Sequence, residues 1–145
     1  MAQKKNSKTA RTTQRQRAMD ILFEADERDI ITSSDISSLL EERRTLSVSQ
    51  VPIKEFGSSI VQAYIDNMML INTVIDEASE DWSITRMNAV DRNILRGATA
   101  ELLFLDTPRN AVISQWSSLA REFSTERSVG FVMGVLNRIA DKNNK

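Results

Sequence analysis

Apolar side chains recur at helical rather than alternating spacing along most of the chain. In the first such segment, Ala18, Leu22 and Ala25 lie at i, i+4 and i+7, which places them on one face of a helix. The β-branched residues are scattered through these segments without the alternation of a strand. The spacing predicts an all-α protein of six or seven helices, over about residues 9–29, 32–44, 52–78 (with a break near Asn67), 88–106, 108–123 and 125–142.

Two of these helices carry their own start signals. Asn88 and Thr125 precede apolar helical patterns and have side-chain oxygens that can accept a hydrogen bond from the first turn. Asp91 lies three residues after Asn88, where a carboxylate suits the positive end of a helix. We therefore expect helices to begin at these two residues.

Two further features predict packing. Trp82, Ile84 and Met87 lie in a turn-rich link and are expected to insert into the core. Gly130 and Gly134 are one turn apart in the last helix, where each glycine costs about 1 kcal/mol relative to alanine. Close approach of a neighbouring helix is the expected reason for both glycines.

Positive charge is concentrated at the N-terminus. Residues 1–17 hold six of the 19 Lys and Arg residues and no acidic residue. The rest of the chain therefore has 13 basic and 20 acidic residues. Counted back from Ala18, Lys8, Arg11 and Arg15 continue the apolar stripe of the first helix. A stripe that is half apolar and half basic cannot be buried along its whole length. Its basic half either projects beyond the core or faces a polyanion.

The side chains of this basic segment suit a nucleic acid. Arg17 adds a further planar fork of donors, which matches phosphate and base edges. Gln14 and Gln16 add hydrogen-bonding groups between the arginines. These residues favour an anionic partner, with nucleic acid as the leading candidate. A solubilising tail is the alternative that the residues leave open.

Composition argues against catalysis and against a membrane protein. The chain has no Cys and no His, which removes thiolate chemistry and the commonest general base and metal ligand. It has no glycine-rich phosphate loop, and we expect neither an enzyme nor a metal or cofactor site. No apolar run approaches the roughly 18 residues of a bilayer span, and the N-terminus lacks the core of a signal peptide. The cytoplasm is the expected location.

Four stretches together resemble the NusB family of transcription antitermination factors. They are RQRAMDILFEAD near the start, MNAVDRNILRGATAELLFLDTP after a Trp, LAREFSTERS, and FVMGVLNRIA. Their spacing also matches, so the resemblance covers nearly the whole chain. It implies a NusB-like all-α fold of two packed helical subdomains. We expect a flexible basic tail over residues 1–8 and one domain over 9–145, divided into subdomains of about 9–80 and 81–142.

The resemblance also implies a function. Family members bind single-stranded boxA RNA of ribosomal-RNA leader transcripts together with NusE, which is also a small-subunit ribosomal protein. The pair joins elongating RNA polymerase with other Nus factors and suppresses termination, without catalysis. Relatives occur as monomers and as homodimers, so the oligomeric state stays open.

Site residues follow from the basic segment and from the resemblance together. The family's arginine-rich RNA segment matches Arg11 through Arg17, its following aromatic residue matches Phe23, and the Phe of its FVNGVL motif matches Phe131. The residues expected to contact RNA are Lys8, Arg11, Gln14, Arg15, Arg17, Phe23 and Phe131. Asp91 matches an acidic residue at the surface that contacts NusE. Each has a structural alternative: Phe23 and Phe131 lie beside apolar stripes, and Asp91 is a helix-start residue.

This chain also departs from the family pattern. Thr12, Thr13 and Gln14 interrupt the usual run of arginines, so two potential phosphate contacts are lost. Further changes in the last two helices fall at Ser114, Gln115, Trp116, Ser118, Met133 and Asn137. The thinned arginine segment keeps open a second function, a protein-interaction module of the same fold with weakened or lost RNA binding. A third possibility is a fragment of an rRNA cytosine methyltransferase, some of which carry a NusB-like N-terminal domain.

Overall fold

The computed structural model describes residues 9–45, 51–80 and 82–145. Over these residues the protein contains seven α-helices, one short 3₁₀-helix and no strand, as the spacing predicts. The expected flexible tail, with Lys8, lies outside the described residues. The elements are α1 (Ala10–Glu27), α2 (Ser33–Thr45), α3 (Glu55–Asp66), α4 (Met68–Ala78), η2 (Ile84–Arg86), α5 (Ala89–Phe104), α6 (Arg109–Phe123) and α7 (Glu126–Lys142).

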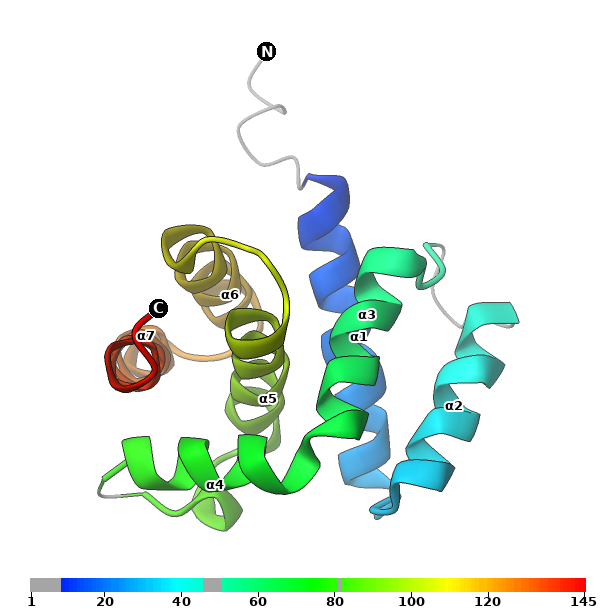
Figure 1. Ribbon diagram of the computed structural model, residues 1–145, viewed down its shortest axis with the longest axis horizontal. Coiled ribbons are helices and arrows are strands. Elements are labelled where there is room, and N and C mark those ends of the chain that lie inside the picture. The colour runs from blue at the N-terminus through cyan, green and yellow to red at the C-terminus, as the bar shows by residue number, and fades with distance from the viewer. Residues whose placement is uncertain (1–8, 46–50, 81) are drawn as a thin grey trace.

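Helix α5 is the centre of the fold. It packs against α1 and α3 on one side and against α4, α6 and α7 on the other (Figure 1). Ten of its 16 residues are buried, whereas the other helices bury one face. Helix α2 lies outermost and covers α1 and α3. No helix in the described part of the chain has the length and apolarity needed to cross a bilayer.

Local signals set the helix boundaries as expected. Asn88 Oδ1 accepts a hydrogen bond from the Asp91 amide at 2.9 Å, and Thr125 Oγ1 accepts one from the Ser128 amide at 3.2 Å. Both predicted caps are therefore confirmed. Thr9 caps α1 in the same way, with its Oγ1 3.0 Å from the Thr12 amide nitrogen.

The predicted break in the long central helix is also confirmed. Residue Asn67 separates α3 from α4, and its side-chain amide donates to the Ala63 carbonyl at 2.9 Å. After this turn α4 packs on α5 and α7 (Figure 1). A subdomain boundary at residue 80 would separate α4 from the helices that it contacts, and that division stays a prediction.

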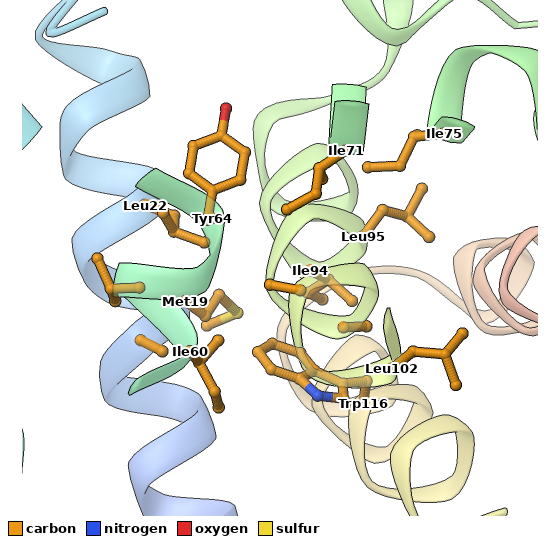
Figure 2. Close-up of a cluster of buried hydrophobic side chains, with 14 of the residues drawn as sticks. Met19, Leu22, Ile60, Tyr64, Ile71, Ile75, Ile94, Leu95, Leu102 and Trp116 are labelled. Atoms are coloured by element: carbon orange, nitrogen blue, oxygen red, sulfur yellow. The ribbon is translucent and has the colours of Figure 1, made fainter. Parts of the chain in front are cut away.

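The core is one continuous apolar cluster around α5. Figure 2 shows Met19 and Leu22 from α1 facing Ile94 from α5, with the indole of Trp116 below them, while Leu95 lies on the other side of α5 beside Ile75. Because burying such side chains is worth about 1.5–3 kcal/mol each, this cluster supplies the main drive for folding.

Two packing expectations prove wrong. The indole of Trp82 is 52 % exposed, while Met87 from the same link is buried. A Cβ added at Gly130 would meet no atom within 4 Å, and one at Gly134 would meet only the end of the Arg138 side chain. Within the described residues, no neighbouring helix lies against the Cβ position of either glycine. The close approach occurs instead at Gly97 of α5, where an added Cβ would overlap the Trp116 ring.

These contacts predict opposite effects for two glycine-to-alanine changes. Gly97→Ala should lower the free energy of unfolding by about 1–3 kcal/mol, because the Trp116 ring must move. Gly130→Ala fills open space in a helix and should raise it by about 0.5–1 kcal/mol. Urea unfolding of both variants provides the measurement, and equal effects at the two positions would contradict the packing described.

Candidate nucleic-acid interface

Arg15, predicted to face RNA, instead points into the protein. Its Nε and one terminal nitrogen donate to the two carboxylate oxygens of Glu101, each at 2.8 Å. The side chains of Arg15 and Glu101 are 4 % and 0 % exposed. The indole N–H of Trp116 donates to the same carboxylate at 2.8 Å. A guanidinium held this way has no surface left for a phosphate.

The Glu101 carboxylate is ionised at neutral pH despite its burial. Burial acts to raise the pKa of Glu101, but hydrogen bonds from Arg15, Thr107 and Trp116 together with the charge of Arg15 lower it below its ordinary value. The result is a bidentate ion pair that joins α1 to the C-terminal part of α5.

Gln14 is also structural. Its Nε2 donates to the Pro52 carbonyl at 3.1 Å, and its Oε1 accepts from the Lys54 amide at 2.6 Å. Thr12, another departure from the arginine run, donates its hydroxyl to Gln115 of α6. The structure argues against direct RNA contacts by Gln14 and Arg15, because their polar atoms have partners within the fold and both residues are buried. Direct contacts of these two side chains with RNA stay a prediction.

Among the described residues of this segment, the accessible positive charge comes mainly from Arg11. Arg11 is exposed, and its guanidinium carbon lies 4.5 Å from the centre of the Phe56 ring. Arg17 is half-buried and pairs with Asp20 at 2.8 Å, which partly neutralises it. Sequence reasoning missed Lys54, an exposed lysine in the segment that Gln14 holds against α1.

Asp91 is buried at the start of α5, with 6 % of the residue exposed. Its Oδ1 accepts from Ser124 at 2.7 Å, and its Oδ2 accepts from Ser128 at 2.7 Å and from Asn88 at 3.0 Å. Asp91 thus lies in the first turn of α5, as expected, and its carboxylate ties the turn between α6 and α7 to α5. Its oxygens are engaged by neutral donors, so it offers little surface to a protein partner.

Phe131 and Asp91 line one pocket of about 390 Å³. Phe131 is half-buried and forms part of its wall. The other lining residues are Trp82, Arg86, Met87, Asn88, Thr125, Arg127 and Ser128.

Two exposed arginines, Arg86 and Arg127, give this pocket its positive charge. Neither side chain makes a hydrogen bond or ion pair with any described residue, and the exposed Trp82 lines the same pocket. Sequence reasoning named none of the three as a binding residue and expected Trp82 to insert into the core.

The basic segment and this pocket lie at opposite ends of α5. Helices α1 and α5 are antiparallel: Arg15 pairs with Glu101 at one end, and Asp26 pairs with Arg92 at the other. Glu101 and Asp91 are ten residues apart in sequence, which is about 15 Å along a helix. Phe23, half-buried in α1, lies between the two ends. The structure therefore divides the predicted RNA residues between two surfaces.

An all-helical core with cationic and aromatic groups on its surface defines a binding protein by class. The NusB family model matches residues 12–141. The antitermination protein NusB of Streptomyces avermitilis is 38% identical over 133 residues, covering 91% of this chain and 92% of that protein. Its counterpart in Bifidobacterium longum is 38% identical over 136 residues, covering 93% of this chain and 70% of that protein.

Solved structures agree. The NusB protein of T. maritima superposes with a TM-score of 0.71 at 31% identity, over 94% of both chains. A NusB structure in complex with NusE and double-stranded RNA gives a TM-score of 0.72 at 26% identity, over 91% of this chain and 96% of that one. The chain belongs to the NusB family, a family of antitermination factors and not of enzymes.

The buried ion pair generates the first prediction of this section. Glu101→Gln keeps the shape of the side chain but leaves the Arg15 charge buried and unpaired, so the free energy of unfolding should fall by about 3–5 kcal/mol. The control is Asp20→Asn, which removes the partner of Arg17 at the surface and should cost at most about 1 kcal/mol. Similar losses in urea unfolding would mean that the buried pair has no special role.

Acid stability supplies a second test. The folded-state pKa of Glu101 lies below its ordinary value of 4.5, so the pair contributes fully above that value. The contribution is lost as pH falls through the lower folded-state pKa, because the unfolded chain then binds the proton more readily. Wild-type stability should therefore decline below about pH 4.5, and Glu101→Gln should decline less steeply. Asp26 and Glu24, whose pKa values are also lowered, keep a residual slope in both proteins. If the free energy of unfolding falls equally steeply with pH in both proteins, the lowered pKa of Glu101 is contradicted.

Proposed function

We propose that this protein is an RNA-binding transcription antitermination factor that acts in the cytoplasm. In this proposal it binds boxA RNA of ribosomal-RNA leader transcripts together with NusE and joins the elongating RNA polymerase complex with other Nus factors. The observation that carries the proposal is the pairing of unneutralised arginines with aromatic rings on two surfaces of a NusB-family fold. A related NusB structure holds both NusE and double-stranded RNA.

The chemistry of the two surfaces suits a single strand. Arg11 offers donors to phosphate near the start of α1, and Lys54 adds a second positive charge in the neighbouring segment. At the other end of α5, Phe131 and Trp82 offer rings on which unpaired bases stack, for about 1–3 kcal/mol per base. Arg86 and Arg127 lie beside those rings and meet the phosphates of the same nucleotides.

Asp91 contributes to the NusE surface through the fold in this proposal. Its carboxylate fixes Ser124 and Ser128 and thereby the turn between α6 and α7. Loss of that carboxylate displaces the turn and weakens NusE binding without removing a direct ion pair.

The alternative function is a protein-interaction module with weakened RNA binding. The burial of Gln14 and Arg15 favours it, because it leaves α1 with fewer free donors than the basic segment suggests. RNA binding by the purified protein, with and without NusE, separates the two functions.

The proposal predicts two distinct effects on binding to a boxA-like single-stranded RNA. Arg11→Ala should weaken binding and reduce the slope of log K against log salt by about 0.7, the value for one phosphate contact on a single strand. Phe131→Leu should weaken binding by about 1–3 kcal/mol per lost stack and leave that slope unchanged, because no charge is removed. Fluorescence anisotropy across a salt series measures both quantities.

Arg121→Ala is the matched control, since Arg121 is an exposed arginine on α6 outside both surfaces. It should alter neither affinity nor slope. If the wild-type protein binds NusE but no RNA, alone or with NusE, the protein-interaction module is the correct function.

A further inference from the structure

A single aromatic ring, that of Phe56 in the first turn of α3, accepts two arginines. The guanidinium carbon of Arg11 lies 4.5 Å from the ring centre and that of Arg15 lies 5.2 Å from it. Both distances are within the range of a cation–π interaction. The two arginines differ in every other respect: Arg15 is buried and fixed by Glu101, whereas Arg11 is exposed. The ring thus connects a rigid internal charge with a free one at the surface.

The position of Phe56 is itself fixed by α1. Gln14 holds the segment before α3 through the Pro52 carbonyl and the Lys54 amide. At Gly57, an added Cβ would lie 2.7 Å from Oε1 and 2.9 Å from the carbonyl oxygen of Gln14. The first turn of α3 therefore rests directly on the backbone of α1. Phe56 has little freedom to move relative to Arg11.

The contact with the Phe56 ring limits the conformations of Arg11. A guanidinium that lies over a ring uses its flat face, while its N–H groups point outward in its own plane. An exposed arginine otherwise loses much rotamer freedom when it binds an anion. A ring that already holds the guanidinium in place reduces that loss and increases affinity.

We propose that Phe56 is a positioning residue for RNA binding, which holds the Arg11 guanidinium flat against the surface so that its N–H groups face a phosphate. Arg15 and Gln14 support the same arrangement from inside, Arg15 through the ring and Gln14 through the segment before α3. The inference rests on the proposed RNA-binding function. It gives the two buried residues of the basic segment an indirect part in binding.

Phe56 also packs partly against the core, so its test must separate positioning from packing. Phe56→Leu keeps an apolar side chain but removes the ring. Phe56→Tyr keeps the ring. Arg11→Lys keeps the charge but replaces the planar group with an ammonium that cannot stack flat. The double variant Phe56→Leu/Arg11→Lys shows whether the two residues act through each other.

The experiment measures binding of full-length variants to a boxA-like single-stranded RNA across a salt series. Phe56→Leu and Arg11→Lys should each raise the Kd by about two- to five-fold, the range of one exposed cation–π pair. The slope of log K against log salt should stay unchanged in both, because no charge is lost. The double variant should be no weaker than either single variant, and Phe56→Tyr should bind as the wild type does.

Phe104→Leu, at an exposed phenylalanine of α5, is the matched control and should leave the Kd unchanged. Thermal melts of each variant accompany the titrations. If Phe56→Leu proves unstable, Phe56→Met replaces it, because methionine fills a similar apolar volume without a ring. Arg11→Lys alone cannot decide, since it also alters the phosphate contact of Arg11 itself.

Two results would overturn the inference while leaving the proposed function intact. In the first, Arg11→Ala weakens binding but Phe56→Leu and Arg11→Lys do not. In the second, the effects of Phe56→Leu and Arg11→Lys multiply in the double variant, which means that they act independently. Absence of RNA binding by the wild-type protein would instead reject the proposed function, and this inference with it.

Discussion

The buried ion pair between Arg15 and Glu101 is the constraint on which the arrangement of this protein depends. Two charges removed from water are costly unless each finds full compensation. Here two hydrogen bonds join the charges, and Trp116 and Thr107 also donate to Glu101. These donors can meet only if α1 and α5 adopt one relative position. The pair therefore sets the register between the helix that carries the basic segment and the helix at the centre of the core.

Polar links of the same kind fix α5 at its other end. Asp26 of α1 pairs with Arg92 and accepts a further hydrogen bond from the buried Asn93. The Asp91 carboxylate accepts hydrogen bonds from the hydroxyl groups of Ser124 and Ser128, on either side of the turn between α6 and α7. Apolar packing alone tolerates many small shifts, whereas buried polar groups lose stability when their partners move. We infer that these links give the apolar core one arrangement and so hold the two candidate binding surfaces at fixed places on α5.

Local features of the fold were predictable from the sequence, and distant partnerships were not. The caps at Asn88 and Thr125 and the break at Asn67 depend on residues within one turn, so the spacing revealed them. The burial of Arg15 depends on a carboxylate 86 residues away, which no local pattern indicates. For the same reason the sequence did not indicate the pocket that Phe131 and Asp91 share, since it combines the 3₁₀ link with residues of α5 and α7.

Arg11 and Arg15 show why the number of basic residues in a segment does not measure its capacity to bind an anion. They lie one turn apart on the same stripe, yet one is exposed and the other is fully engaged inside. With fewer free donors on α1, binding of a single strand depends more strongly on how well each donor is placed. It also depends more strongly on the second surface, where rings supply energy that salt does not screen. On the proposed function, this protein should therefore bind RNA with a shallower salt dependence than the basic residues of its N-terminal segment would suggest.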